Sequence, residues 1–255
     1  MGGMRRMTGR FLAALQFFVA LKLPSLVARH VDHDSGLNRA IVYFPLAGLV
    51  IGIAVALVWL GVATLLPAMP AAGIAIAAGV ILTGGLHEDG LADCADGLGS
   101  EDREKILEIM RDSRSGSYGV AAIVLSLGLR WTALAAMPIA AGALALVIAH
   151  TLSRAAIALA LRFSSYARRE GTGSLVAAGI STEKVVVTAT VALVIAALLG
   201  GLPGTAALVA GFAAAALVLL IMERRIGGYT GDVLGAMQQV AEIAAIIVLA
   251  AFWAL

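Results

Sequence analysis

Seven apolar stretches follow one another along this chain, and all but 185–200, which is short for a span, are about as long as a bilayer is thick. A hydrocarbon core of roughly 30 Å requires about 20 predominantly apolar residues in a helix. Backbone groups inside a bilayer find no water, so such stretches must be helical. We therefore predict an all-α, polytopic integral membrane helix bundle. The predicted spans are 41–63, 69–86, 119–137, 139–161, 185–200, 203–221 and 234–255.

The composition supports one membrane-embedded domain over residues 1–255. Hydrophobic residues make up 61% of the chain and charged residues 13%, whereas a soluble domain has about 45–50% and about 25%. A soluble globule of this length could not bury so much apolar surface in one core. The single cysteine, Cys94, excludes an intrachain disulfide. Nothing in the composition predicts a nucleic-acid partner, and the partner that follows is the lipid bilayer.

Basic residues occupy every second connection between the predicted spans. The connections 64–70, 137–140 and 200–204 contain no lysine or arginine, whereas the alternate segments do. Basic loops remain on the cytoplasmic side of a membrane. The sequence therefore predicts a multi-pass membrane protein whose basic loops lie in the cytoplasm. The basic residues that decide this are Arg5, Arg6, Arg10, Lys22, Arg29, Arg39, Arg103, Lys105, Arg111, Arg114, Arg162, Arg168, Arg169, Lys184, Arg224 and Arg225.

The first apolar run, Phe11 to Leu23, is too short to span and contains Gln16 and Lys22. Arginines precede it, as in a cleavable signal peptide, but no clear small-residue cleavage site follows. A complete extra span would move the arginine-rich N-terminus outside. We favour an interfacial or re-entrant helix with both ends inside.

Most of the chemistry is concentrated in an acidic segment within residues 84–118, which begins 84-GGLHEDGLADCADGLGS-100. If the helix of the second span continues inward, Asp89, Asp93 and Asp96 share one face at positions i, i+4 and i+7. Like charges so spaced repel, and Mg²⁺, which takes carboxylate and phosphate oxygens, would neutralise them. A solvated acidic loop is the alternative. The spacing favours a metal site formed by these three aspartates, with room beside it for a phosphate-bearing substrate.

Two neighbours of these aspartates have open roles. His87 is either a general base or a helix cap, and the residues alone do not decide between them. Cys94 is a small packing residue rather than a zinc ligand, because one thiol beside one histidine is a poor zinc site.

A basic segment follows in 100-SEDREKILEIMRDSRSGSYG-119. Ser100 is expected to cap a short amphipathic helix. Arg111, Ser113 and Arg114 then precede a glycine-punctuated loop, and such groups suit phosphate binding. A solvated basic loop is the alternative, but beside the aspartates a diphosphate site is the better interpretation.

Four ionisable residues lie inside predicted spans, where lipid exposure would be costly and function is the usual reason. They are Arg130, His150, Arg154 and Glu242. His150 and Arg154 are i, i+4 neighbours and are expected to face a common cavity. A polar stripe in the last span either forms interhelical hydrogen bonds or lines the site. Its members are Asp232, Gly235, Gln239 and Glu242.

Taken in order, these motifs resemble the cobalamin synthase family, also called adenosylcobinamide-GDP ribazoletransferase. The central pattern H-x-D-G-L-A-D-x-x-D-G is long and specific, and the matches cover most of the chain. Glu88 stands where the family usually has a hydrophobic residue, and Arg111 where lysine is usual. The supporting segments are 107-LEIMRDSRSGSYGV-120, 43-YFPLAGLVIG-52, 166-YARREGTG-173 and 230-TGDVLGAMQQVAE-242.

The resemblance implies a Mg²⁺-dependent transferase that joins adenosylcobinamide-GDP to α-ribazole or its 5′-phosphate and releases GMP. Its partners would be the corrinoid nucleotide and α-ribazole, with self-association or complexes with other corrinoid-pathway enzymes left open. The catalytic residues implied are His87, Asp89, Asp93, Asp96 and Asp112. The substrate-binding residues are Arg111, Ser113, Arg114, Arg154, Asp232 and Glu242.

Two rival functions are less favoured. A CDP-alcohol phosphotransferase has the pattern D-G-x-x-A-R, but Asp93 stands where that arginine belongs. A transporter would use the intramembrane charges as its pathway, but no convincing internal repeat is present.

Overall fold

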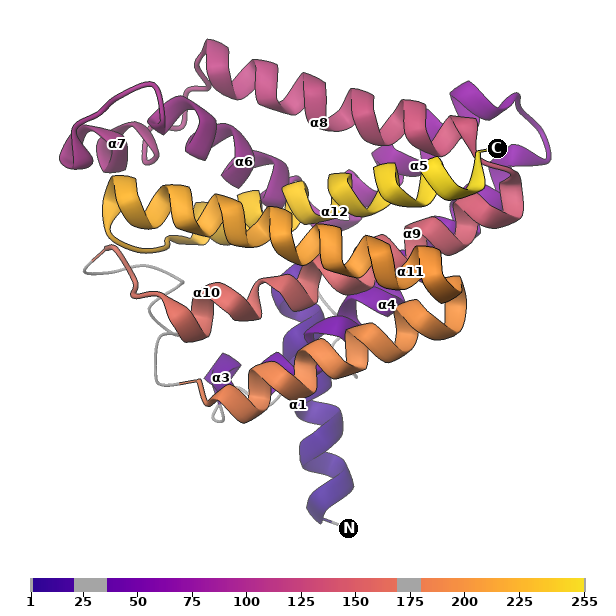
Figure 1. Ribbon diagram of the computed structural model, residues 1–255, viewed down its shortest axis with the longest axis horizontal. Helices are drawn as coiled ribbons and strands as arrows, with labels where there is room; N and C mark the ends of the chain where they lie inside the picture. Colours follow the sequence, from indigo (N-terminus) through magenta and orange to yellow (C-terminus); the bar gives the residue numbers. More distant parts are fainter. Residues whose placement is uncertain (1, 21–35, 169–179, 255) are drawn as a thin grey trace.

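The apolar stretches form long helices that are stacked into one bundle (Figure 1). The computed structural model describes residues 2–20, 36–168 and 180–254, and these contain no strand, only an isolated bridge between Tyr166 and Tyr229. A 3-10 turn, Ile41–Tyr43, precedes α4. The helices are α1 (Gly2–Phe18), α3 (Gly36–Ala40), α4 (Phe44–Ala63), α5 (Ala68–Thr83), α6 (Leu86–Gly97), α7 (Arg103–Ile109), α8 (Ser117–Ala136), α9 (Ile139–Ala156), α10 (Ala158–Phe163), α11 (Thr182–Ile226) and α12 (Gly231–Trp253).

Prolines mark the starts of several helices. Pro67 and Pro138 are the N-caps of α5 and α9, and Pro45 lies in the first turn of α4. Proline suits these positions because the first helical N–H groups have no intrahelical partner to lose.

Five of the described helices are long and apolar enough to cross a membrane, or six if α5 and α6 together form one span. One of the five, α11, has 45 residues and a non-helical glycine, Gly201, at φ 55° and ψ −133°. The chain reverses direction there, and Figure 1 shows the two arms of α11 running back alongside each other. These arms match the predicted spans 185–200 and 203–221. The helical membrane bundle is confirmed, while the count of seven spans stays a prediction.

The continuation of the second span into the acidic segment was wrong. The helix ends at Gly84 and Gly85, whose φ values of 71° and 69° are left-handed. Only glycine adopts two such conformations in succession without steric strain. Because of this break, α5 and α6 meet at 89°, and the acidic segment forms a separate helix.

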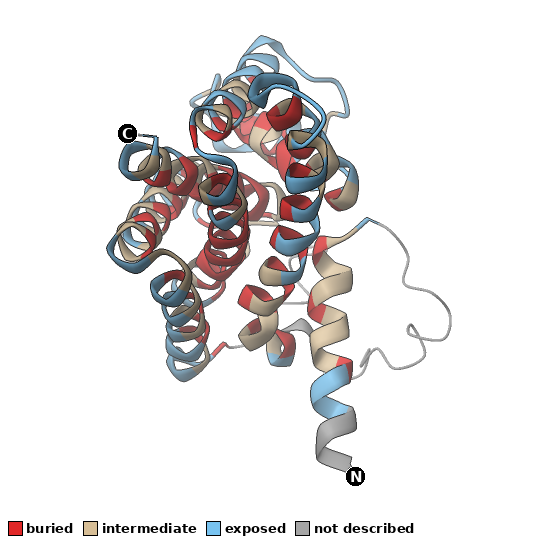
Figure 2. Ribbon diagram, turned by 90° about the vertical axis from the view of Figure 1, so that its right-hand side faces the viewer, coloured by how far each residue is buried: buried red, intermediate tan, exposed pale blue. Residues whose placement is uncertain are grey.

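The centre of the bundle is the span Ile139–Phe163, which contains α9. Its apolar stretch is 89% buried, whereas that of α8 is 22% buried. Figure 2 shows the buried residues gathered in the middle of the bundle, with exposed faces around them. Large apolar side chains such as Leu57, Leu198 and Val209 are 64%, 80% and 66% exposed on those outer faces. Such a surface suits lipid rather than water.

The N-terminal helix α1 is not among the candidate spans, and Figure 1 shows it running across the direction of the bundle. Its last aromatic residues contact α4, with the ring of Phe17 stacked 5.7 Å from that of Phe44. The chain then approaches α5, where the Ala20 amide donates to the Leu82 carbonyl at 3.1 Å. The rest of the predicted interfacial segment, including Lys22, lies outside the described residues.

Candidate active site

Helices α6 and α12 cross in direct backbone contact. A Cβ atom at Gly90 would lie 2.6 Å from the carbonyl oxygen of Asp232, and one at Gly235 would lie 3.2 Å from Cα of His87. Only glycine allows so close an approach. The crossing holds the acidic segment against the first turn of α12.

The acidic face, which we define as Asp89, Asp93 and Asp96, lies on α6 as the spacing predicted. Asp89 is exposed, and the other two are partly buried. Helix α6 is not among the five helices that could each cross a membrane alone, but α5 and α6 together could form one bent span. Burial, followed by repulsion from Asp89 and from Asp232, raises the pKa of Asp93 from 3.8 to about 7. The acidic face therefore carries negative charge that its surroundings do not neutralise.

Arg168 offsets part of this charge. Its Nη2 donates to Oδ2 of Asp232 at 2.9 Å and to the Met110 carbonyl at 3.3 Å. Its position is set by the bridge in which Tyr229 donates to the Ser165 carbonyl and Ala167 donates to the Tyr229 carbonyl, both at 2.9 Å. This arginine belongs to a segment noted in the sequence for its resemblance, but no role was assigned to it there.

Asp96 performs a structural task. Its two carboxylate oxygens accept hydrogen bonds from the amides of Gly116, at 2.7 Å, and Gly119, at 2.8 Å. Gly116 is the N-cap of α8, so Asp96 acts as a cap supplied from another helix. A Cβ at Gly119 would lie 2.3 Å from this carboxylate, which explains the glycine there.

No three or more His, Cys, Asp or Glu side chains of the described residues converge as a ready-made metal cage. Mg²⁺ commonly uses only one or two carboxylates and completes its shell with water and phosphate oxygens. The donors on the acidic face are all carboxylate oxygens, and their charge is in excess. They fit such an open site, and the metal assignment to Asp89, Asp93 and Asp96 stays a prediction.

The predicted phosphate-binding residues Arg111, Ser113 and Arg114 are exposed in the loop between α7 and α8. Asp112 accepts from Nη2 of Arg114 at 2.6 Å and from its backbone amide at 3.0 Å. These hydrogen bonds lower the pKa of Asp112 to about 2. The bonds of Asp96 to the glycine amides hold this basic loop next to the acidic face.

The predicted cap at Ser100 was wrong. The N-cap of α7 is Asp102, whose side chain accepts from the Lys105 amide at 2.8 Å. Both residues are good caps, and the helix begins at the later one.

His87 is 3% exposed and does not cap α6, whose N-cap is Gly85. The cap alternative was therefore wrong. The imidazole stacks on the ring of Phe18, with centroids 5.9 Å apart and planes inclined by 21°, and its Nδ1 has no hydrogen-bond partner. Burial lowers the pKa of His87 to about 3, so the ring is neutral near pH 7. A role as general base stays a prediction.

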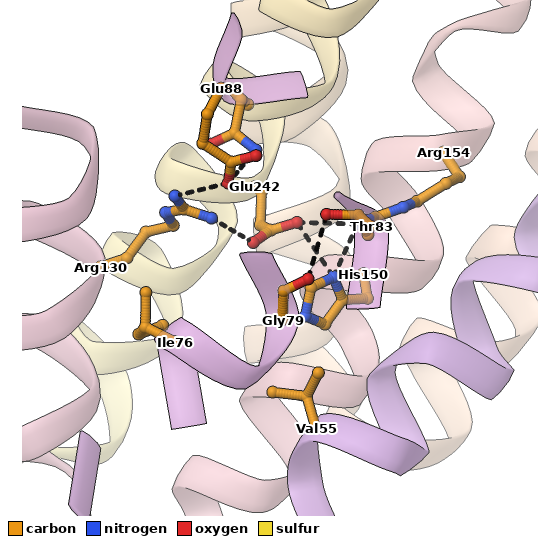
Figure 3. A pocket seen from close by; sticks show the side chains of 10 residues that line it. Val55, Ile76, Gly79, Thr83, Glu88, Arg130, His150, Arg154 and Glu242 are labelled. Carbon is orange, nitrogen blue, oxygen red and sulfur yellow. Dashed lines mark hydrogen bonds and ion pairs between the residues drawn. The ribbon is translucent and has the colours of Figure 1, made fainter. Parts of the chain in front are cut away.

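A second group of charges lies inside the bundle, and we call it the buried charge cluster. Glu242 of α12 is its centre, accepting from Arg130 Nη1 at 2.9 Å and Arg154 Nη1 at 2.7 Å and lying 3.0 Å from His150 Nδ1 (Figure 3). Glu88 of α6 accepts from Nη2 of Arg130 at 3.1 Å. These residues line a small cavity of about 260 Å³. The members of the cluster are Glu88, Arg130, His150, Arg154 and Glu242.

Two glutamines add hydrogen bonds to this cluster. Gln238 donates to Glu242 at 2.6 Å, and Gln239 donates to Glu88 at 3.1 Å. The common cavity predicted for His150 and Arg154 is confirmed. With two glutamates against two arginines, the cluster is balanced apart from its histidine.

The polar stripe predicted on α12 is divided between the two groups. Gln239 and Glu242 form interhelical hydrogen bonds, whereas Asp232 and Gly235 face α6. Arg154 is bonded to Glu242 in the interior, so the substrate-binding roles of these two stay predictions.

No partner was predicted from the sequence for Arg130, and Gln238 was not singled out. One signal was available, because two arginines inside apolar helices need two buried carboxylates. Glu242 is one of them, and Glu88 had to be recognised as the other.

Comparisons with known proteins give one consistent result. The chain is 42% identical to an adenosylcobinamide-GDP ribazoletransferase of Shewanella amazonensis over 251 residues, which cover 95% of each chain. It is 43% identical to one of Bradyrhizobium diazoefficiens over 227 residues, covering 86% of this chain and 85% of that one. No solved structure matches. A family model described as cobalamin-5-phosphate synthase matches residues 10–250, and the chain belongs to that family.

Proposed function

We propose that this protein joins adenosylcobinamide-GDP to α-ribazole or α-ribazole 5′-phosphate, with release of GMP. The reaction is the one for which the relatives are named. The observation that carries it is the position of the acidic face beside the basic loop, held there by the bonds from Asp96 to the amides of Gly116 and Gly119. Carboxylates for a metal next to arginines for phosphate are what phosphoryl transfer requires.

The reaction depends on Mg²⁺ in this proposal. Asp89 and Asp93 would hold the ion, with Asp96 available through the lone pairs that its amide bonds leave free. When bound, Mg²⁺ would neutralise charge on the diphosphate of the activated corrinoid.

Arg111 and Arg114 bind the GMP phosphate as it departs, with the hydroxyl of Ser113 beside them. The bond between Arg114 and Asp112 is exposed, with 88% and 38% of the two side chains accessible. Exposed ion pairs contribute little to the stability of a protein. A phosphate can therefore replace Asp112 as the partner of Arg114.

A hydroxyl of α-ribazole attacks the phosphorus on the corrinoid side. One P–O bond forms there, the bond to the GMP phosphate breaks, and the proton of the hydroxyl passes to a carboxylate of the acidic face. Asp89 is its acceptor in this proposal, because it is the exposed member of that face.

We place these loops on the cytoplasmic side of the bacterial inner membrane. In Figure 1, α7, the C-terminal end of α10 and both ends of α11 lie at the left end of the bundle, and the turn of α11 lies at the right. The elements at the left end carry Arg103, Lys105, Arg162, Lys184, Arg224 and Arg225, and basic segments remain inside.

The test is GMP release by the full-length protein in proteoliposomes. We expect release only with both substrates and Mg²⁺ present, and we expect Asp93→Asn to lower the rate about 100-fold or more. Glu108→Gln, which changes an exposed carboxylate on α7 that pairs with Lys105, is the matched control. Absence of release by the wild type would refute the function, and full Mg²⁺-dependent release by Asp93→Asn would refute the metal assignment alone.

A further inference from the structure

An open pocket of about 600 Å³ lies between α1, the start of α6 and the start of α12. Its inner wall is apolar, formed by Phe18, Ile157 and Leu234, which are at most 4% exposed. Its other end carries Leu86, which is 56% exposed, and the exposed Asp89. The pocket therefore runs from an apolar interior to the acidic face.

One of the residues that line this pocket, His87, carries an unpaired polar atom. Its Nδ1 is buried and makes no hydrogen bond to any described residue, and the residue as a whole is only 3% exposed. Buried polar atoms are nearly always paired, and an exception asks for an explanation. A ligand that fills the pocket and offers one hydrogen-bonding atom would supply that pair.

The aromatic side chains around His87 favour a planar ligand. Phe18 stacks on the imidazole, and Phe17 meets Phe18 edge to face, with centroids 4.9 Å apart and planes at 78°. The corner thus contains stacked and edge-to-face pairs, the two geometries that aromatic groups prefer, and a further ring could extend it. Phe17 is only partly buried and has surface left for a further ring.

We propose that this pocket, the base pocket, binds the aromatic base of α-ribazole, and that Phe17, Phe18 and His87 of this chain recognise it. The inference rests on the proposed function and adds where its nucleophile binds. The base enters against the apolar wall, and its free ring nitrogen pairs with His87. The ribose then lies toward Asp89 and Asp232, so its hydroxyl faces the acidic face.

The other substrate offers a base of different chemistry. Guanine presents several donors and acceptors along its edge, and each would need a partner when buried. Apart from the two carboxylates Asp89 and Asp232, His87 is the one polar side chain among the described residues that line the pocket. A benzimidazole, with one free ring nitrogen and an otherwise apolar outline, matches the inner wall, whereas guanine does not.

The proposal is tested by the binding of α-ribazole to the full-length protein in detergent, followed by fluorescence of the benzimidazole without corrinoid or Mg²⁺. Phe18→Leu removes the aromatic face at similar volume, and we expect it to weaken binding about five- to tenfold. Leu86→Trp fills the mouth of the pocket from an exposed position and should abolish binding. Phe11→Leu is the control on the same helix, because Phe11 contacts Tyr43 and does not line the pocket.

In turnover, the same two variants should raise the KM for α-ribazole and leave the KM for adenosylcobinamide-GDP unchanged. Unchanged binding and KM in Leu86→Trp, with normal GMP release by the wild type, would overturn the base pocket and leave the function standing. Displacement of bound α-ribazole by GMP alone would also overturn it, because guanine would then be the occupant. Binding that depends on Phe18 and Leu86 without any GMP release would support the pocket and refute the function. Should Phe18→Leu fail to fold, Leu86→Trp decides.

Discussion

Glu88 and Asp89 are neighbours on α6, yet they belong to regions of opposite character. Glu88 points inward to the buried charge cluster, where Arg130 neutralises it, and it is 7% exposed. Asp89 points outward to the acidic face, where carboxylates exceed cations. Buried charges must be neutralised by the protein itself, whereas an open excess of charge can be neutralised by a ligand. One helix therefore separates charges that stabilise the bundle from charges that are available for chemistry.

The largest effect is expected inside the bundle. Glu242→Gln leaves Arg154 without a carboxylate partner, and breaking a buried ion pair in this way costs about 3–5 kcal/mol. Thermal or denaturant unfolding in detergent measures it. Glu108→Gln, an exposed substitution, should change stability by no more than about 0.5 kcal/mol. Equal stability of the two variants would remove the structural role that we give the cluster.

A smaller loss is expected from Glu88→Gln. Arg130 keeps its bond to Glu242, and the glutamine retains an oxygen that can accept from it. We expect the free energy of unfolding to fall by about 1–3 kcal/mol, the usual penalty for an imperfectly paired buried group. The free energies of unfolding of Glu88→Gln and Glu242→Gln are measured side by side. If Glu88→Gln loses as much stability as Glu242→Gln, then Glu88 rather than Glu242 is the centre of the cluster.

A substitution of Asp96 tests whether the three carboxylates of the acidic face have the same role. Asp96→Ala removes the cap on α8, and we expect about 1–2 kcal/mol of destabilisation together with slower GMP release. Glu101→Ala, at an exposed acidic residue of the same segment, is the control. Unaltered stability with lost Mg²⁺-dependent activity would make Asp96 a ligand of the metal instead of a cap.

Asp93 should give the smallest change, of opposite sign. Its pKa in the folded protein, about 7, lies above the ordinary 3.8, so its contribution to stability is full below pH 3.8 and is lost as the pH rises through 7. Without divalent cations, Asp93→Asn should raise the melting temperature by a few degrees at pH 8 and leave it unchanged near pH 4.

Added Mg²⁺ should stabilise the wild type and narrow this difference, because it neutralises the same carboxylate. Glu108→Gln should show neither effect. A lower melting temperature of metal-free Asp93→Asn at pH 8 would contradict the excess of negative charge on the acidic face.

The sequence was sufficient for the features that depend on local pattern. Apolar length located the long helices. The orientation inferred from the alternation of basic loops stays a prediction. The spacing of Asp89, Asp93 and Asp96 gave their common face, because helical periodicity holds whether or not α6 continues α5. The membership of the family also followed from the motifs, and it is confirmed.

Features that depend on which segments meet in space were out of reach. A Gly-Gly pair signals a turn, but its angle follows from the packing of α6 on α12. Asp96 bonds to amides 20 and 23 residues further along the chain, and no local rule pairs them. Arg130 lies between Glu88 and Glu242 only because α6, α8 and α12 adjoin, and helical periodicity does not specify neighbours.

The crossing of α6 and α12 at Gly90 and Gly235 has a consequence for how such an enzyme diversifies. A Cβ at Gly90 would clash with the backbone of Asp232, and one at Gly235 would push against the backbone of His87, so the crossing constrains the relative positions of the carboxylates near it. Phe17 and Leu86, which line the pocket away from that contact, are free to vary. Mutations at these positions can therefore change the selectivity for the base of the nucleophile while the reactive carboxylates keep their positions. A laboratory search for altered base preference should begin with these two residues.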